Sequence, residues 1–120
     1  MNPRKKRKIE ELLRRELSSI LLRDINDPRA GFVTVTGVEL SGDQRSASVR
    51  VMVHGSPEDT ERNLEMLRHA RGYIQGLIGE RLSLRYTPVL SFEEDTEMRD
   101  VLRLESLIDR ARREDREFKS

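Results

Sequence analysis

The pattern of hydrophobic and polar positions predicts an amphipathic helix near the N-terminal end, from about residue 4 to about residue 24. Apolar side chains recur there at steps of three and four, which aligns them on one helix face. They are Ile9, Leu12, Leu13, Leu17, Ile20, Leu21 and Ile25. The opposite face is charged and carries Arg4, Lys8, Glu11 and Arg15. We expect the helix to end at Asn26-Asp27-Pro28, because the residue before a proline is disfavoured in helical conformation.

The next segment has the pattern of a β-hairpin. Residues 32–40 are rich in valine and threonine, which favours a strand, but the apolar positions before and after Gly37 are out of phase. A bulge at Gly37 would place both sets on the core side. After a turn over residues 41–45, apolar and polar residues alternate over residues 47–54. An antiparallel hairpin is the simplest connection between two such strands.

A second helix is predicted to begin at Ser56-Pro57, because serine is a good N-cap and proline suits the first helical position. Its apolar stripe comprises Leu64, Leu67, Ala70, Ile74, Leu77 and Ile78. Gly72, Gly76 and Gly79 interrupt this stripe and lower helix stability. We therefore expect a bend, or two helices, instead of one straight helix.

The C-terminal part predicts a short strand and a last helix. Residues 88–92 have the pattern of a third strand, in which a proline is allowed at the start. Asp95 or Thr96 would cap a helix whose apolar side comprises Met98, Val101, Leu102, Ile108 and Ala111. From Arg112 onward nearly every residue is charged or polar, so we expect a domain over residues 1–111 and a flexible, frayed tail over residues 112–120. The order α-β-β-α-β-α predicts an α+β two-layer sandwich with a three-stranded sheet and helices packed on one face.

Charge is distributed unevenly along the chain, although the net charge is only +1. Basic residues dominate the first fifteen positions, above all the run from Arg4 to Lys8, whereas acidic residues dominate between Glu93 and Asp109. A molecule with one basic and one acidic pole can orient on a polyanion. Well-solvated helix faces explain the same charges equally well.

Catalytic and metal sites find little support in the sequence. The chain has no cysteine, and His54 and His69 have no partner at metal-ligand spacing. Glu93-Glu94-Asp95 could bind magnesium, but an acidic loop that caps the next helix is the simpler interpretation. Phosphate-loop, dinucleotide and nucleophile motifs are missing. We expect a protein that is not an enzyme, has no cofactor and carries no signal peptide or membrane span.

Four stretches of the chain resemble the ribosome-binding factor A family. They are Asp27-Pro28-Arg29, the segment from Val33 to Ser41, the segment from Ala70 to Ile74, and the segment from Leu82 to Phe92. The resemblance implies a type II KH-like fold and a cytoplasmic bacterial factor. It also implies binding to the small (30S) ribosomal subunit and its 16S rRNA during late maturation, a need for the factor in 16S precursor processing, and release by an assembly GTPase. We expect a monomer.

The resemblance also implies a helix–kink–helix in place of the Gly-x-x-Gly loop of KH domains, with an Ala-x-Gly signature that here is Ala70-Arg71-Gly72. We expect the central helix to break there, with Gly72 allowing a backbone angle or close packing that a side chain forbids. Gly76-Leu77-Ile78-Gly79 is a literal Gly-x-x-Gly, but its middle residues continue the apolar stripe. Packing is therefore the better interpretation of that motif.

RNA contacts are expected to be made to phosphates by lysine and arginine. The few aromatic residues, Phe32, Tyr73, Tyr86 and Phe92, lie in or beside structured segments, where the core is their usual place, and form no stacking platform. The candidate RNA-binding residues are Arg4, Lys5, Lys6, Arg7, Lys8, Arg45, Arg50 and Arg71. Arg71 could equally be a solvated helix residue. The alternative function is a protein-interaction module whose charged helices dock an acidic protein partner, and an RNA-processing nuclease is weaker still.

Overall fold

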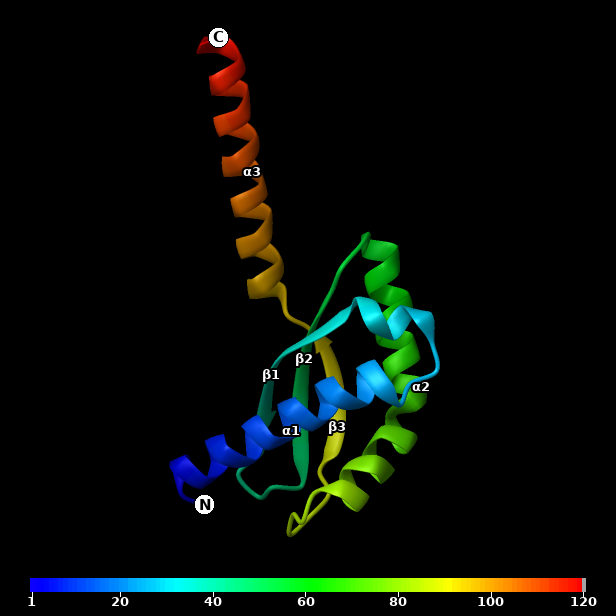
Figure 1. Cartoon of the computed structure of the whole chain (residues 1–120). Coiled ribbons are helices and arrows are strands. Elements are labelled where there is room, and N and C mark those ends of the chain that lie inside the picture. The colour runs from blue at the N-terminus through cyan, green and yellow to red at the C-terminus, as the bar shows by residue number, and fades with distance from the viewer. Residues whose placement is uncertain (120) are drawn as a thin grey trace.

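The computed structural model describes residues 1–119, with side chains through residue 116. Its elements follow the predicted order α-β-β-α-β-α, with one additional 3₁₀ helix after the first α-helix (Figure 1). They are α1 (Pro3–Arg23), η1 (Pro28–Phe32), β1 (Val33–Leu40), β2 (Ser46–Val53), α2 (Pro57–Arg81), β3 (Val89–Glu94) and α3 (Thr96–Lys119).

The three strands form one sheet in the order β1-β2-β3. β1 and β2 pair antiparallel as a hairpin, and β3 runs parallel to β2. The register of the hairpin shifts between Val35 and Gly37, which confirms the predicted bulge. Val35 before the shift and Val38 and Leu40 after it are all buried, so the bulge keeps both halves of β1 facing the core.

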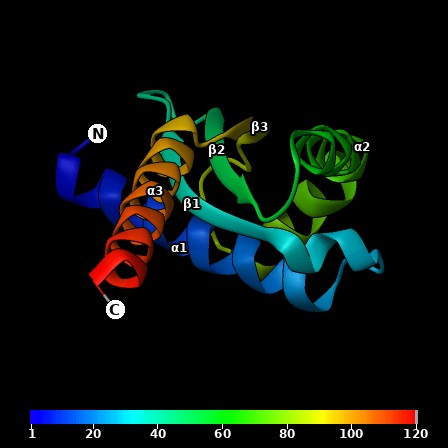
Figure 2. The ribbon, with the colours of Figure 1, turned by 90° about the horizontal axis from the view of Figure 1, so that it is seen from above.

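Two helices cover one face of the sheet. α1 crosses the sheet and α2 lies alongside it near β3 (Figures 1 and 2). The apolar residues of β2 are buried beneath them, whereas Arg50 and the other residues that alternate with them face the opposite side. That second face of the sheet remains open to solvent and is mostly polar, as expected for a two-layer sandwich.

The ends of α1 and α2 are joined by a polar link that the sequence did not reveal. Arg81, the last residue of α2, donates from both Nη atoms to the carboxylate of Asp24 at 2.8 Å, and from Nη1 to Glu16 at 3.1 Å. A bidentate arginine–carboxylate pair fixes direction as well as distance. The link therefore holds the two helices at a defined mutual position over the sheet.

α3 is the exception to the packing of helices on the sheet. It projects away from the body (Figure 1), and its apolar side chains are exposed, with Leu104 59% and Leu107 60% accessible. The covered face of the sheet is already occupied by α1 and α2, and the open face offers little apolar area. The helix continues through residues 112–119, where fraying stays a prediction, and residue 120 lies outside the described residues.

The expected core positions of two aromatic residues are wrong. Phe32 and Tyr73 are each 56% exposed, whereas Phe92 is buried on the core side of β3. Phe32 ends η1 before the alternation of β1 begins, and Tyr73 lies on the outer side of α2. Neither position follows the apolar stripe of its neighbouring element.

α2 begins with a capping box that depends on the preceding glycine. Ser56 Oγ accepts from the Asp59 backbone N–H at 3.2 Å, and Asp59 Oδ2 accepts from the Ser56 backbone N–H at 2.9 Å. Gly55 has a φ of 144°, and a Cβ placed on it would lie 2.5 Å from Asp59 Oδ2. Only glycine satisfies both the backbone angle and the space.

We therefore expect Gly55→Ala to lower the free energy of unfolding by about 1–3 kcal/mol, because the substitution strains the backbone and disturbs the capping box. Thermal and urea unfolding of the purified protein measure this effect. Gly42→Ala is the matched control, since a Cβ at Gly42 meets no atom within 4 Å and its φ is not positive. Equal stability of the two variants would contradict the role of Gly55.

Candidate nucleic-acid interface

The first turns of α1 concentrate positive charge where a helix least favours it. Asn2 caps the helix by accepting from the Arg4 backbone N–H at 2.8 Å, and no acidic residue lies in the first turn. The positive end of the helix dipole favours acids at this position, so a run of cations there is electrostatically unfavourable. Within the described chain, the side chains of Arg4, Lys5, Arg7 and Lys8 are exposed and form no ion pair or hydrogen bond.

Lys6 differs from its neighbours because its charge is already partnered. Its Nζ donates to Glu39 Oε1 at 2.9 Å and lies 4.0 Å from Glu10 Oε2. The hydrogen bond to Glu39 raises the pKa of Lys6, and the same bond lowers the pKa of Glu39. Glu10 also accepts from the backbone N–H of Leu40 at 2.8 Å. Lys6 and Glu10 therefore attach the start of α1 to the end of β1.

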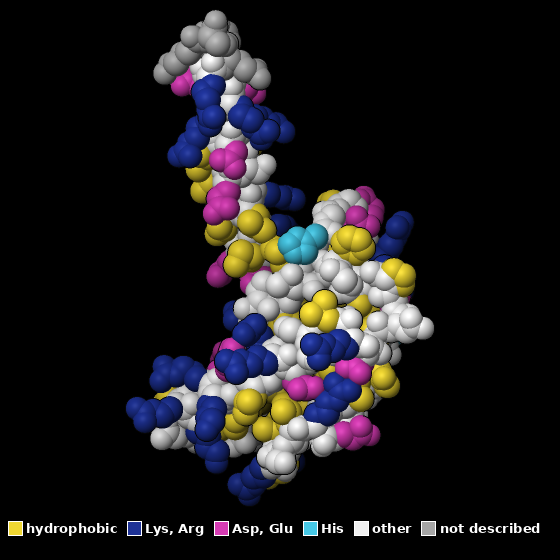
Figure 3. All heavy atoms as spheres, viewed as in Figure 1, with side chains coloured by type: hydrophobic (Ala, Val, Ile, Leu, Met, Phe, Trp, Pro, Cys, Tyr) yellow, Lys and Arg dark blue, Asp and Glu magenta, His cyan; other side chains and the backbone are white. Residues whose placement is uncertain are grey.

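A second group of cations lies at the same end of the molecule. The β1–β2 turn carries Arg45, whose guanidinium carbon lies 4.8 Å from the centre of the Tyr86 ring. Arg85 lies in the loop before β3, and its guanidinium carbon is 5.4 Å from the same ring centre. The start of α1, this turn and the loop before β3 lie together at the lower end in Figure 1, and basic side chains gather there in Figure 3. We call this surface the basic end, formed by Arg4, Lys5, Arg7, Lys8, Arg45 and Arg85.

Arg50 lies apart from the basic end, on the open face of the sheet. A Cβ on Gly37 would come within 2.7 Å of Arg50 Nη2, so the bulge glycine leaves the space that this guanidinium occupies. Asp95 lies nearby. Thr36 donates to it at 2.6 Å, and this bond, aided by the Met98 backbone N–H and the charge of Arg50, lowers the pKa of Asp95. Because Arg50 also lowers the pKa of Glu39, its charge is partly balanced by two carboxylates.

Arg71 and Gly72 lie on the exposed outer side of α2, and Arg71 has no partner among the described side chains. Of the two predicted alternatives, a bend or two helices, the structure has the bend: α2 is one continuous helix from Pro57 to Arg81, and its path bends in Figure 1. The expected reason for Gly72 is wrong. Its φ is not positive, and a Cβ on it would meet nothing within 4 Å. A kink centred at Ala70-Arg71-Gly72 stays a prediction.

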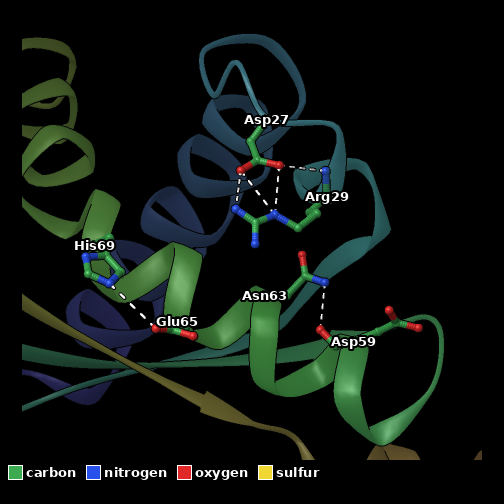
Figure 4. Close-up of polar contacts among 6 residues, drawn as sticks. All are labelled: Asp27, Arg29, Asp59, Asn63, Glu65 and His69. Atoms are coloured by element: carbon green, nitrogen blue, oxygen red, sulfur yellow. Dashed lines mark hydrogen bonds and ion pairs between the residues drawn. The ribbon is translucent and has the colours of Figure 1, made fainter.

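Arg29, which lies beside this part of α2, is paired with a carboxylate (Figure 4). Arg29 forms a forked contact with Asp27, donating from Nε at 3.0 Å and from Nη2 at 2.6 Å. The side-chain bond from Arg29 lowers the pKa of Asp27 to about 2. On α2 itself, His69 Nε2 lies 3.9 Å from Glu65 Oε1. Figure 4 also shows Asn63, whose amide nitrogen donates to the Asp59 carbonyl at 2.8 Å.

The literal Gly-x-x-Gly segment serves packing. Ile78 is 1% exposed in the core, Leu77 packs against the core, and a Cβ on Gly79 would lie 3.1 Å from Thr87 Oγ1. The segment lies inside α2 and forms no loop. The packing interpretation of the sequence is therefore confirmed.

The acidic segment before α3 has structural roles. Asp95 caps α3 by accepting from the Met98 backbone N–H at 3.0 Å, Glu94 pairs with Arg99 at 3.5 Å, and Glu93 accepts from Ser48 at 2.9 Å. No group of histidine and acidic side chains within the described part of the chain could hold a metal ion. None of the helices found there is long and apolar enough to cross a bilayer.

Comparisons with known proteins agree on one family. The family model described as ribosome-binding factor A matches residues 5–108. Ribosome-binding factor A from Halothermothrix orenii is 40% identical over 115 residues, which cover 96% of this chain and 94% of that protein. The crystal structure of ribosome-binding factor A from Thermus thermophilus is similar at a TM-score of 0.65 and 29% identity, covering 74% of this chain and 94% of that chain.

A further similar structure is a homology model of ribosome-binding factor A from Thermus thermophilus, fitted into the cryo-EM map of its complex with 30S. It matches at a TM-score of 0.60 and 29% identity, covering 72% of this chain and 90% of that chain. Ribosome-binding factor A structures are KH-like, so the predicted KH-like α+β fold class is confirmed.

Proposed function

The chain belongs to the ribosome-binding factor A family, and on this premise we propose that it binds the small ribosomal subunit through 16S rRNA during late maturation and is needed for efficient processing of the 16S precursor. It acts as a cytoplasmic monomer without catalytic chemistry, and an assembly GTPase releases it. The 30S complex of the Thermus thermophilus relative supports the choice of partner.

The observation that carries the proposal is the uncompensated charge at the start of α1. Four exposed cations occupy the helix terminus that favours anions, and none is neutralised within the described chain. Arg45 and Arg85 add further positive charge at the same end. Nucleic-acid phosphates would offset this repulsion, and binding would gain free energy from counterion release.

Residues of the open sheet face and of α2 are proposed as further contacts. Arg50 and Arg71 are both exposed, so a subunit surface could reach them. Of the two, Arg71 is the stronger candidate for a phosphate contact, because the charge of Arg50 is already partly balanced by Glu39 and Asp95. We assign Lys6 mainly to the attachment of α1 to β1, since its Nζ is held by Glu39.

The second candidate function, a protein-interaction module, is favoured by α3. Its apolar side chains are exposed along a helix that contacts little of the body, and exposed apolar surface often marks protein contact sites. Salt dependence distinguishes the two functions, because phosphate binding weakens steeply with salt and apolar docking does not.

The direct test is co-sedimentation of the protein with purified small subunits and with full ribosomes over a range of salt concentrations. We expect binding to the small subunit alone. Lys5→Ala combined with Lys8→Ala should flatten the slope of log affinity against log salt by about 1.4–1.8, if each lysine contacts one phosphate. Circular dichroism should show an intact fold, since neither side chain contributes to the core.

The matched control removes two other exposed cations, Arg23 and Arg62, by substitution with alanine. These lie away from the basic end, so the slope should stay within error of the parent. A slope that falls equally in both double variants would mean that only net charge matters. An unchanged slope in the Lys5/Lys8 variant would show that these lysines face solvent in the complex.

Gly72 provides a test of the α2 surface. Gly72→Val should leave the free energy of unfolding within about 0.5 kcal/mol, because the added side chain enters open space and valine is no worse than glycine in a helix. Binding to the small subunit should weaken, because the side chain obstructs close approach of the partner. Gly76→Val, one turn further along the same exposed side, is the control, and equal binding by both variants would contradict the proposed contact.

The cellular role predicts a specific defect. Cells that lack the protein should accumulate free small subunits carrying unprocessed 16S precursor, because the last maturation steps proceed inefficiently without the factor. Sucrose-gradient profiles and mapping of the 16S rRNA ends measure this, with a plasmid copy of the gene as the control. Normal profiles and mature ends at both low and optimal temperature would refute the assembly role.

A further inference from the structure

Two arginines from separate loops converge on one aromatic ring at the basic end. Arg45 closes the β1–β2 turn and Arg85 precedes β3, and both guanidinium groups lie over the ring of Tyr86, at 4.8 and 5.4 Å from its centre. Tyr86 is half-buried, whereas both arginines are exposed. The cation–π attraction therefore favours the placement of both charges beside this half-buried ring.

The backbone around this ring is fixed by hydrogen bonds. The Val89 backbone N–H donates to the Arg45 carbonyl at 2.9 Å, which joins the two loops directly. Asp43 Oδ1 accepts from the Arg45 backbone N–H at 3.1 Å and from Ser41 Oγ at 2.6 Å. Gln44 adopts a φ of 65°, a left-handed conformation typical of tight turns. The turn that carries Arg45 therefore has a defined shape and is joined to the start of β3, just after Arg85 and Tyr86.

The stacked guanidinium groups keep their hydrogen-bonding capacity. Stacking uses the flat face of a guanidinium and leaves the N–H donors in its plane free. Neither Arg45 nor Arg85 donates a side-chain hydrogen bond or forms an ion pair with any other described residue. The nearby Asp43 carboxylate accepts from the Ser41 hydroxyl and the Arg45 backbone N–H, and these bonds, aided by the charge of Arg45, lower its pKa. Asp43 forms no hydrogen bond with the Arg45 side chain.

The unsatisfied donors and the like charges indicate what this site would bind. Two guanidinium groups held near one ring repel each other, and an anion that accepts from both would offset that repulsion. Arginine matches phosphate oxygens with paired N–H donors, and preorganised side chains lose less entropy on binding. The site also adjoins the cations at the start of α1, so the same strand of nucleic acid could contact both.

We propose that Arg45 and Arg85, stacked on Tyr86, form a clamp for a backbone phosphate of ribosomal RNA. Tyr86 is the positioning residue of this clamp and Arg85 a phosphate contact. The clamp rests on the proposed function, because it presupposes that RNA is the partner. It recognises the charge and position of the backbone, not the base sequence.

The experiment measures small-subunit binding by the full-length chain over a range of salt concentrations. The Arg45→Ala, Arg85→Ala double variant should flatten the slope of log affinity against log salt by about 0.7–0.9, because one phosphate contact is lost, and Arg85→Ala alone should flatten it by no more than that. Tyr86→Leu keeps both charges but should weaken binding about 3- to 10-fold, because the two stacking contacts that orient the arginines are lost.

Conservative and matched variants separate positioning from a general structural effect. Tyr86→Phe retains the ring face and should bind like the parent. Phe32→Leu removes an exposed aromatic ring that carries no cation and should also bind like the parent. Thermal unfolding accompanies each binding curve. If Tyr86→Leu fails to fold, the slopes of the two arginine variants decide, since both arginine side chains are exposed.

The clamp is overturned if the double arginine variant keeps the parental slope, or if Tyr86→Phe binds as weakly as Tyr86→Leu. A loss of binding in Phe32→Leu equal to that in Tyr86→Leu would also overturn it. These outcomes differ from failure of the proposed function. In that case the parent protein itself would show no salt-dependent binding to small subunits.

Discussion

The structure depends on one constraint, which is that a three-stranded sheet must bury one face completely. The sheet does so beneath α1 and α2, with side chains such as Leu13, Val49 and Leu67 excluded from solvent. The bulge at Gly37 is part of this solution, because without it half of β1 would turn its valines toward water. Once the apolar faces of α1 and α2 are used in this way, their charged faces and ends must point outward.

The same constraint divides the cations into those that pair with a carboxylate of the fold and those that do not. Lys6, Arg29 and Arg81 lie where two elements meet, and each finds a carboxylate that joins those elements or shapes a turn. The cations of the basic end lie beyond these junctions and form no ion pair within the described fold, although the charge of Arg45 contributes to the lowered pKa of Asp43. The uncompensated charge therefore gathers where α1 begins and two loops meet. An electrostatic repulsion that the fold does not offset is the physical reason to seek an external polyanion.

Much of the architecture could be predicted from the sequence, because periodicity reports which face of an element is buried. The stripe of α1, the alternation of β2 and the phase change at Gly37 each correspond to an observed feature. The exposure of α3 could not be predicted in this way, since an amphipathic pattern is the same whether or not a partner covers it. The continuous path of α2 could not be predicted either, because glycines lower helix stability without dictating a break.

The candidate site was harder to predict, since it depends on contacts between distant segments. The run from Arg4 to Lys8 is visible in the sequence, but the pairing of Lys6 with Glu39 depends on how α1 lies along β1. Arg85 has no sequence signal of its own. Its importance appears only when the fold brings Arg45 and Tyr86 together.

Contacts to phosphates alone carry no sequence information, so on the proposed function selectivity must come from the spacing of contacts on a rigid body. The fold supplies such spacing. Lys6 and Glu10 fix the start of α1 to β1, and Arg81 fixes the end of α2 to the end of α1. The basic end and Arg71 are thereby held at a set separation on one framework. An RNA surface whose phosphates match that separation can engage both, whereas a flexible strand must lose conformational entropy to adopt it.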